Sequence, residues 1–285
     1  MSVFERCLEK CRARKGAVVY SDGEDRRVVS AAAKLIREGL VEPILIGDPE
    51  KVRAALQESG ETGVSLQVVN PYNPALLQHN AAEYMSIQKD KGKDISEEEA
   101  IKAVKNPLAA GALMVRRGEA EIGVAGNLSS TADVIRAGLR MVGTAAGSKT
   151  VSSFFFMLKD NNVCMFTDCA VIPEPTSAQL ADIAISTAGV YKRVMGDEAR
   201  VALLSFSTKG SAKHDNVSLV AEAVKIAKDK APELKLDGEL QFDAAIVPSV
   251  GEFKAPGSEV AGHANVFIFP DLQAGNIGYK IAERL

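Results

Sequence analysis

The stretch AVVYSDGEDRRVVSAAAKLIREGLVEPILIGDP, residues 17–49, decides the fold class. Residues 17–20 are a short apolar run, which predicts a buried strand. In residues 25–40 the apolar side chains recur on one helical face: Val28, Val29, Ala32, Leu35, Ile36 and Leu40. Residues 43–46 predict a second strand, which the turn-forming GDP ends. Strand, helix and strand in this order predict a β-α-β unit with parallel strands.

The same alternation continues through the first half of the chain. Strands are expected at residues 66–69 and 122–126, and helices at 50–58, from 73 or 74 onward, from 97, at 108–117 and at 133–142. Ser96 and Glu99 have the spacing of a capping box, which marks a helix start. This pattern predicts a mostly parallel sheet with helices on both faces.

The second half has a different character. Residues 148–158 and 163–173 are two strand-like runs joined by KDNN, which predicts a hairpin. Helices are expected at 177–195, 217–230 and 272–285, and strands at 201–207, 243–249 and 264–270. The change near Gly147 predicts two α/β domains, residues 1–147 and 148–285, with the final helix leading back toward the first domain.

Composition excludes several classes of protein. The chain has 285 residues, a formal net charge of -3 and no Trp, so a nucleic-acid-binding surface is not expected. The N-terminus lacks the apolar core of a signal peptide and no run is long enough to span a bilayer, so we expect a cytoplasmic protein away from membranes. The four cysteines form no paired zinc motif, and we expect no metal site.

The motif AGNLSSTADVIRAGLR, residues 125–140, is the first candidate binding site. A strand expected to be buried ends at Gly126, and the following turn offers Asn127, Ser129, Ser130 and Thr131 before a helix begins. Free backbone N–H groups and hydroxyls there can bind an anion, and Arg136 can add a bidentate contact. The alternative is that Ser130 or Thr131 only caps the helix.

Two later loops are also candidates. LLSFSTKGSAKHD, residues 203–215, follows a strand with Ser207, Lys209 and Gly210, at the strand end where ligands bind in α/β sheets. In residues 269–285, Asn276 can bind a ligand or only organise the turn. The first of these loops can likewise be a polar connection without a ligand. The histidines are scattered and no GxSxG is present, so a serine hydrolase is not indicated.

Six segments in order resemble the phosphate acetyltransferase and phosphate butyryltransferase family: residues 125–140, 149–158, 166–184, 201–212, 237–248 and 269–285. The motif at 127–140 is most similar to the ethanolamine-utilisation branch of that family. The resemblance implies two α/β domains with an active-site cleft between them and a fold like that of isocitrate and isopropylmalate dehydrogenases. It implies a homodimer, which in this branch can associate with a bacterial microcompartment.

The resemblance also implies a reaction: acetyl-CoA and phosphate give acetyl phosphate and CoA, reversibly and with no cofactor. In the family an Asp takes the proton of the CoA thiol and arginines neutralise phosphate. Arg136 matches a family arginine at the phosphoryl group, and Ser130 and Thr131 match the hydroxyls beside it. The remaining matches, Ser207, Lys209, Gly210 and Asn276, are cleft positions with less defined roles.

Two departures from the family follow from the same comparison of motifs. An arginine that often precedes a KxKG stretch is Gln88 here, with Lys89 or Lys91 as possible substitutes. The family's N-D-L-S-R-G motif, with its Ser, Arg and general-base Asp, would lie beyond Leu285, so the catalytic residues stay unassigned and the last helix is interpreted as cut short. A fragment that binds phosphate or CoA without turnover, a phosphate butyryltransferase and a related decarboxylating dehydrogenase are the alternatives.

Overall fold

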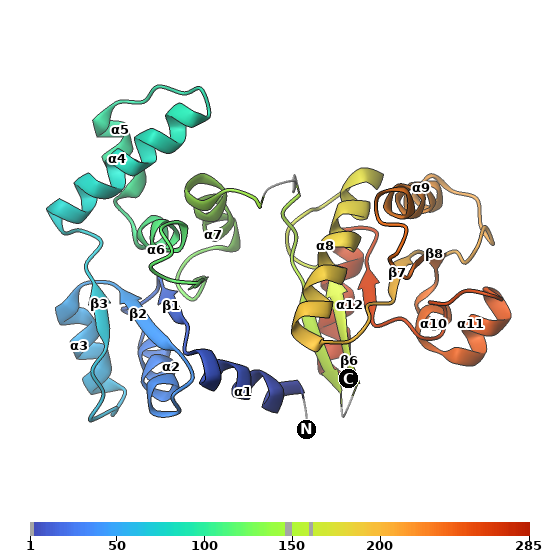
Figure 1. The fold of residues 1–285 in the computed structure, drawn as a ribbon, viewed down its shortest axis with the longest axis horizontal. Coiled ribbons are helices and arrows are strands. Elements are labelled where there is room, and N and C mark those ends of the chain that lie inside the picture. The colour runs from blue at the N-terminus through green and yellow to red at the C-terminus, as the bar shows by residue number, and fades with distance from the viewer. Residues whose placement is uncertain (1–2, 146–149, 160–161) are drawn as a thin grey trace. The chain divides into compact units, whose positions relative to one another are not determined.

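The computed structural model describes residues 3–145, 150–159 and 162–285 and contains two compact units, Val3–Gly143 and Thr144–Leu285 (Figure 1). The predicted boundary between residues 147 and 148 lies outside the described residues. Each unit has its own sheet and its own buried core.

The first unit is built on four parallel strands in the order β3-β2-β1-β4. These strands are β1 (Ala17–Tyr20), β2 (Glu42–Ile46), β3 (Gln67–Val69) and β4 (Ile122–Val124). The helices are α1 (Val3–Arg14), α2 (Arg26–Arg37), α3 (Pro49–Glu58), α4 (Pro74–Asp90), α5 (Glu97–Val104), α6 (Pro107–Arg116) and α7 (Thr131–Ala137), followed by a π-helical turn, η1 (Gly138–Val142). The predicted β-α-β unit is β1-α2-β2.

Helices cover both faces of this sheet, as a parallel sheet requires. On one face, Val29 of α2 packs with Leu45 of β2 and Val52 of α3. On the other face, Met114 of α6 packs with Val19 of β1. The predicted alternation of strands and helices is therefore confirmed in this unit.

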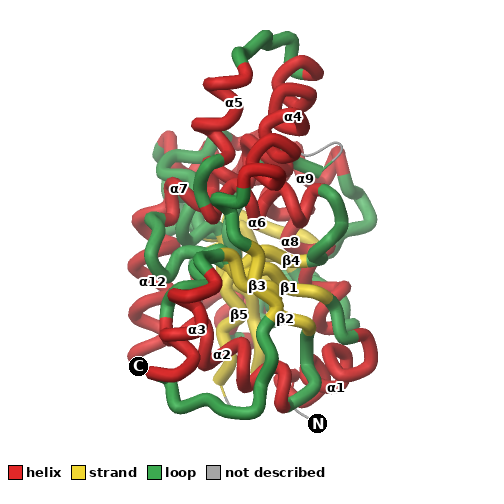
Figure 2. Tube along the Cα trace, turned by 90° about the vertical axis from the view of Figure 1, so that its left-hand side faces the viewer, coloured by secondary structure: helices red, strands yellow, loops and turns green. Residues whose placement is uncertain are grey.

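Helices α4 and α5 lie side by side beyond the end of the sheet in both views (Figure 1 and Figure 2). The predicted capping box starts α5: Glu99 N donates to Ser96 Oγ over 3.2 Å, and Ser96 N donates to Glu99 Oε2 over 2.9 Å. Leu113 of α6 and Met141 of η1 join the apolar cluster between α4 and α5. The π-helical turn is thus anchored in a core.

The second unit has a five-stranded sheet in the order β5-β6-β9-β7-β8, of which only the hairpin β5-β6 is antiparallel. The strands are β5 (Phe155–Lys159), β6 (Asn162–Thr167), β7 (Val201–Leu204), β8 (Leu236–Leu240) and β9 (Val266–Ile268). The helices are α8 (Ser177–Met195), α9 (Asp215–Lys230), α10 (Phe242–Ile246), α11 (Pro248–Lys254) and α12 (Leu272–Arg284). The predicted hairpin is confirmed, while residues 160–161 of its turn are outside the described chain.

The strand predicted at residues 243–249 is wrong. These residues belong to α10 and α11, and the strand of this region is β8, which lies just before them. A short apolar run does not distinguish a buried strand from a buried helix. Ala244 and Ala245 are fully buried, and Pro248 begins α11, where its missing N–H is tolerated.

The buried strand predicted to end at Gly126 is also corrected. β4 ends at Val124, and Ile122 and Val124 are 56% and 43% exposed. Among the described residues β4 pairs with β1 alone, which makes it an edge strand. The helix predicted at 133–142 begins earlier, at Thr131, and continues as the wider turn η1 from Gly138.

No helix among residues 3–145, 150–159 and 162–285 is long and apolar enough to cross a membrane. In the same part of the chain, no three or more His, Cys, Asp or Glu side chains are grouped so that they could hold a metal ion.

Candidate functional site

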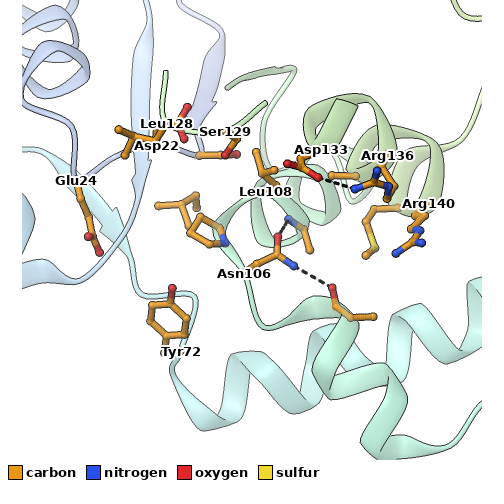
Figure 3. A pocket seen from close by; sticks show the side chains of 17 residues that line it. Asp22, Glu24, Tyr72, Asn106, Leu108, Leu128, Ser129, Asp133, Arg136 and Arg140 are labelled. Carbon is orange, nitrogen blue, oxygen red and sulfur yellow. Dashed lines mark hydrogen bonds and ion pairs between the residues drawn. The ribbon is translucent and has the colours of Figure 1, made fainter. Parts of the chain in front are cut away.

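A pocket of about 440 Å³ opens in the first unit at the carboxyl ends of its strands (Figure 3). Ser21 and Asp22 follow β1, Tyr72 follows β3, and Asn106 caps α6. The other walls are the loop after β4, α7 and η1. Ligands of open α/β sheets bind at this edge, and the volume suits a small molecule.

Asp22 fixes the loop after β4. Its carboxylate is buried and accepts hydrogen bonds from Gly126 N over 2.8 Å and from Asn127 N over 2.9 Å. β1 and β4 are neighbours in the sheet although about a hundred residues of chain separate them. The chain turns from one side of β1 to the other here, which is the switch point where α/β sheets form their crevice.

Ser130 caps the N-terminus of α7 and is hydrogen-bonded to Asp133. Asp133 N donates to Ser130 Oγ over 3.2 Å, and Ser130 Oγ donates to the Asp133 carboxylate over 2.7 Å. Arg136 Nη1 contacts the other oxygen of Asp133 at 2.5 Å. The Ser130 hydroxyl and the Arg136 charge lower the pKa of Asp133. Ser130 therefore caps α7, while the binding of an anion by this turn stays a prediction.

The pocket includes part of the predicted residue set. Ser129 and Arg136 line it, and the Arg136 side chain is 54% exposed. Asn127, Ser130 and Thr131 lie on the same loop and helix start but are not among its lining residues. Asn127 instead contributes its backbone, which accepts from Arg27 Nη2 over 3.4 Å as well as donating to Asp22.

Several pocket residues were not predicted from the sequence. Asp22 and Tyr72 follow strands that were expected, so their position after a strand was the available signal. Glu24 is held by Lys51 Nζ at 3.1 Å and by Asp48 N at 2.9 Å. Arg140 lies four residues after Arg136 in the motif of residues 125–140, and the helical spacing of the two arginines could have indicated it.

The loop with Ser207, Lys209 and Gly210 lies in the second unit and is organised by Glu239 of β8. Glu239 is buried, and its Oε1 accepts from Ser207 Oγ over 2.9 Å and from Gly210 N over 2.7 Å. Ser207 Oγ also accepts from Ala212 N over 3.1 Å. The groups expected to face a ligand are therefore occupied by a carboxylate of the protein itself.

Lys209 is paired with Asp237 of β8 and donates to the Gly238 carbonyl over 3.0 Å. Burial alone would raise the pKa of Asp237, but hydrogen bonds from Lys209 and Ser258 outweigh it, so the pKa lies below its usual value. The Lys209 ammonium is 39% exposed at the side chain, so it remains partly accessible to solvent.

Asn276 fastens α12 to the loop after β6. Its Nδ2 donates to the Cys169 carbonyl over 3.0 Å. The neighbouring Asp168 carboxylate is buried and accepts from Ala170 N over 3.0 Å and from Ile172 N over 2.8 Å. In this structure Asn276 organises a turn, which is one of the two predicted alternatives.

The cations suggested near Gln88 do not reach the pocket. Gln88 is buried on α4, and Lys89 and Lys91 are exposed at the end of that helix. None of the three lines the pocket. Within the described chain, the positive charges that line it are Arg136 and Arg140.

Comparison with known proteins extends these observations. Residues 2–285 match the family described as "Phosphate acetyl/butaryl transferase". The "Phosphate acetyltransferase" of Bacillus subtilis is 44% identical over 283 residues, which are 99% of this chain and 86% of that protein.

Solved structures give the same relationship. A phosphotransacetylase from Streptococcus pyogenes superposes with a TM-score of 0.91 at 42% identity, covering 99% of this chain and 85% of that one. The "EutD phosphotransacetylase from Staphylococcus aureus" superposes with a TM-score of 0.87 at 41% identity, covering 99% of this chain and 86% of that one.

A more distant structure bears on the fold alone. It is a putative 4-hydroxythreonine-4-phosphate dehydrogenase from Salmonella typhimurium, with a TM-score of 0.53 at 12% identity, covering 94% of this chain and 84% of that one. The predicted α/β fold of the isocitrate dehydrogenase type is confirmed. The match over 2–285 and the identities above 40% show that the chain belongs to the phosphate acetyl/butyryl transferase family.

Proposed function

We propose that the chain is a phosphate acetyltransferase, which transfers an acetyl group reversibly between CoA and inorganic phosphate. The observation that carries this proposal is the pocket at the strand ends, lined by Arg136 and Ser129, in a chain 44% identical to a phosphate acetyltransferase. Arg136 would hold the phosphoryl group, because a guanidinium matches phosphate oxygens in a bidentate geometry.

The chemical step needs a thiolate. The thiol of CoA loses its proton, the sulfur attacks the acetyl carbonyl of acetyl phosphate, and the C–O bond to phosphate breaks with its electron pair on the phosphate oxygen. The proton lost by the thiol ends on the departing phosphate, which is released as hydrogen phosphate. Charge builds up on the carbonyl oxygen and on the leaving phosphate. In our proposal Arg136 and the hydroxyl of Ser129 stabilise the phosphate side of this charge.

A second candidate, binding of phosphate or CoA without turnover, is favoured by the state of the pocket carboxylates. Asp22 holds the loop after β4, Glu24 is paired with Lys51, and Asp133 is bound by Ser130 and Arg136. Each of these three pocket carboxylates therefore already has a structural role, so none is an obvious base for the thiol.

One assay separates the two candidates. The chain is mixed with acetyl phosphate and CoA, and formation of the thioester is followed by its ultraviolet absorbance. Turnover at an enzymatic rate supports the acetyltransferase. Binding of phosphate or CoA by calorimetry without thioester formation supports the second candidate, and neither binding nor turnover contradicts both. Butyryl phosphate in a parallel reaction tests acyl preference, with acetyl expected to be faster.

The proposal includes a homodimer that uses acetyl-CoA, CoA, phosphate and acetyl phosphate in the cytoplasm, without a metal or redox cofactor. Association with a bacterial microcompartment is part of the same proposal. Light scattering gives the oligomeric state: a mass near twice 30.3 kDa is expected, and a monomer at assay concentrations would contradict the dimer.

A further inference from the structure

Two guanidinium groups line the pocket of the first unit, and they differ in their partners. Arg136 is tied to Asp133 at 2.5 Å, so part of its charge is neutralised. The side chain of Arg140 makes no hydrogen bond or ion pair with any described residue, although it lines the same pocket. Among the described residues that line the pocket, the guanidinium without an ion pair is therefore that of Arg140 rather than that of Arg136.

The backbone holds Arg140 in place. Gly143 N donates to Gly138 O over 2.9 Å, which closes the wide turn η1, a feature often found at functional sites. Met141, the next residue, is 2% exposed and packs in the cluster formed with α4, α5 and α6. Arg116 Nη1 donates to the carbonyls of Met141 and Val142 over 3.4 and 3.3 Å.

The two arginines share one wall of the pocket. They are four residues apart along a continuous helical segment, which places side chains on the same face. Figure 3 shows both at the same end of the pocket, with the dashed ion pair on Arg136 alone. A phosphoryl group bound there meets one partly neutralised guanidinium and one free guanidinium.

Resting on the proposed function, we propose that Arg140 is a phosphate-binding residue that contacts the same phosphoryl group as Arg136. A phosphate dianion carries more charge than Arg136 can balance while it is paired with Asp133. Arg140 supplies the second cation that Lys89 and Lys91, at the end of α4, do not bring to the pocket. Its five donors allow a bidentate contact to the oxygens that Arg136 leaves unpaired.

Three variants test this role. Arg140→Gln removes the charge, Arg140→Lys keeps the charge without the fork of donors, and Arg53→Gln is the control. Arg53 lies exposed on α3, paired with Glu50, and does not line the pocket. Calorimetry gives Kd for phosphate, acetyl phosphate and CoA, steady-state kinetics give KM and kcat, and urea unfolding gives stability.

We expect Arg140→Gln to raise Kd for phosphate and acetyl phosphate about tenfold or more, the usual effect of losing a charged hydrogen bond. Arg140→Lys should fall between Arg140→Gln and the unchanged chain. The Kd for CoA and the unfolding midpoint should match those of Arg53→Gln. A raised KM for acetyl phosphate, with a smaller effect on KM for CoA, is the kinetic counterpart.

Several results would overturn the proposal. Equal affinities for phosphate in Arg140→Gln and Arg53→Gln would do so, as would a loss of stability in Arg140→Gln with unchanged affinity. An effect on CoA alone would assign Arg140 to the phosphates of CoA instead. If the unaltered chain shows neither turnover nor phosphate binding, the proposed function is wrong as well. If the unaltered chain binds phosphate and Arg140→Gln binds it equally well, only the role of Arg140 is wrong.

Discussion

Arg136 and Asp133 lie one turn apart on α7, and their ion pair sets the conditions under which Arg136 can bind an anion. Both side chains are about half exposed, at 54% and 50%. An exposed pair at this spacing contributes little to stability. A bound phosphate can therefore compete with Asp133 for the guanidinium at small cost to the fold.

We predict that Arg136→Ala weakens phosphate and acetyl phosphate binding by roughly 2–4 kcal/mol, because a charged contact to an anion is lost. Calorimetry and the KM for acetyl phosphate measure the effect. Arg53→Ala, on exposed α3, serves as the control and should leave both unchanged. An unaltered Kd and KM in Arg136→Ala would refute its role.

Ser207 looks similar to the pocket residues in sequence but has a different environment. It is fully buried and bonded to Glu239, which lies more than thirty residues later in the chain. Nothing near residue 207 in the sequence indicates that partner. The position of these residues after predicted strands therefore identified the polar loops correctly. Only the packing of the folded chain shows whether a hydroxyl faces a ligand or donates to a buried carboxylate.

We predict that Ser207→Ala lowers the free energy of unfolding by about 1–3 kcal/mol, because the buried Glu239 carboxylate loses a donor. Urea denaturation measures this change. Ser186→Ala, at an exposed position of α8, removes a hydroxyl without a partner in the described structure and should change stability by under about 0.5 kcal/mol. Equal stability in the two variants would show that Ser207 does not stabilise the loop.

At the scale of elements, the long amphipathic helices and the apolar strands were predictable, and β8, α10 and α11 were not. α8 spans the predicted residues 177–195, because an amphipathic pattern sustained over many turns fits a helix and not a strand. β8 was missed because Asp237, Gly238 and Glu239 are typical of turns. Their polar groups are paired with Lys209 and Ser207 across the sheet, a tertiary effect that no local pattern contains.

α12 depends on a close approach at Gly275. A Cβ atom there would lie 2.3 Å from the carbonyl oxygen of Asp168, a backbone atom that cannot rotate away. We predict that Gly275→Ala lowers the free energy of unfolding by about 1–3 kcal/mol through this overpacking. Chemical denaturation tests it, with exposed Gln273→Ala on the same helix as the control. Stability equal to that of Gln273→Ala would mean that α12 does not need this contact.

At the scale of the whole molecule, each unit has its own sheet and core. We therefore predict that a destabilising substitution in one unit leaves the local stability of the other unit unchanged. In Gly275→Ala, amide hydrogen exchange should speed up in β6 and β9 while β1 and β2 keep their rates, because exchange reports local stability. Equal acceleration in both sheets would show that the two units unfold as one.

The fold class itself was predictable from the sequence, since residues 17–49 already specify a β-α-β unit and hence a parallel sheet. The exposure of β4 was not, because an apolar run does not reveal whether its strand lies at the centre or the edge of a sheet. The pocket was half predictable: the motif that contains Arg136 was found, but Asp22 and Tyr72 reach it only through the strand order β3-β2-β1-β4.

The four cysteines divide into two pairs by their place in the fold. Burial raises the pKa of Cys164 to about 11, and burial with the charge of Asp168 raises the pKa of Cys169 to about 12, so both are protonated thiols at neutral pH. Cys7 and Cys11 lie half-buried on α1. A chromogenic disulfide reagent used to count free CoA would therefore also count thiols of the protein, beginning with α1. A fluorophore attached by the same chemistry would report on that helix and leave the second sheet unlabelled.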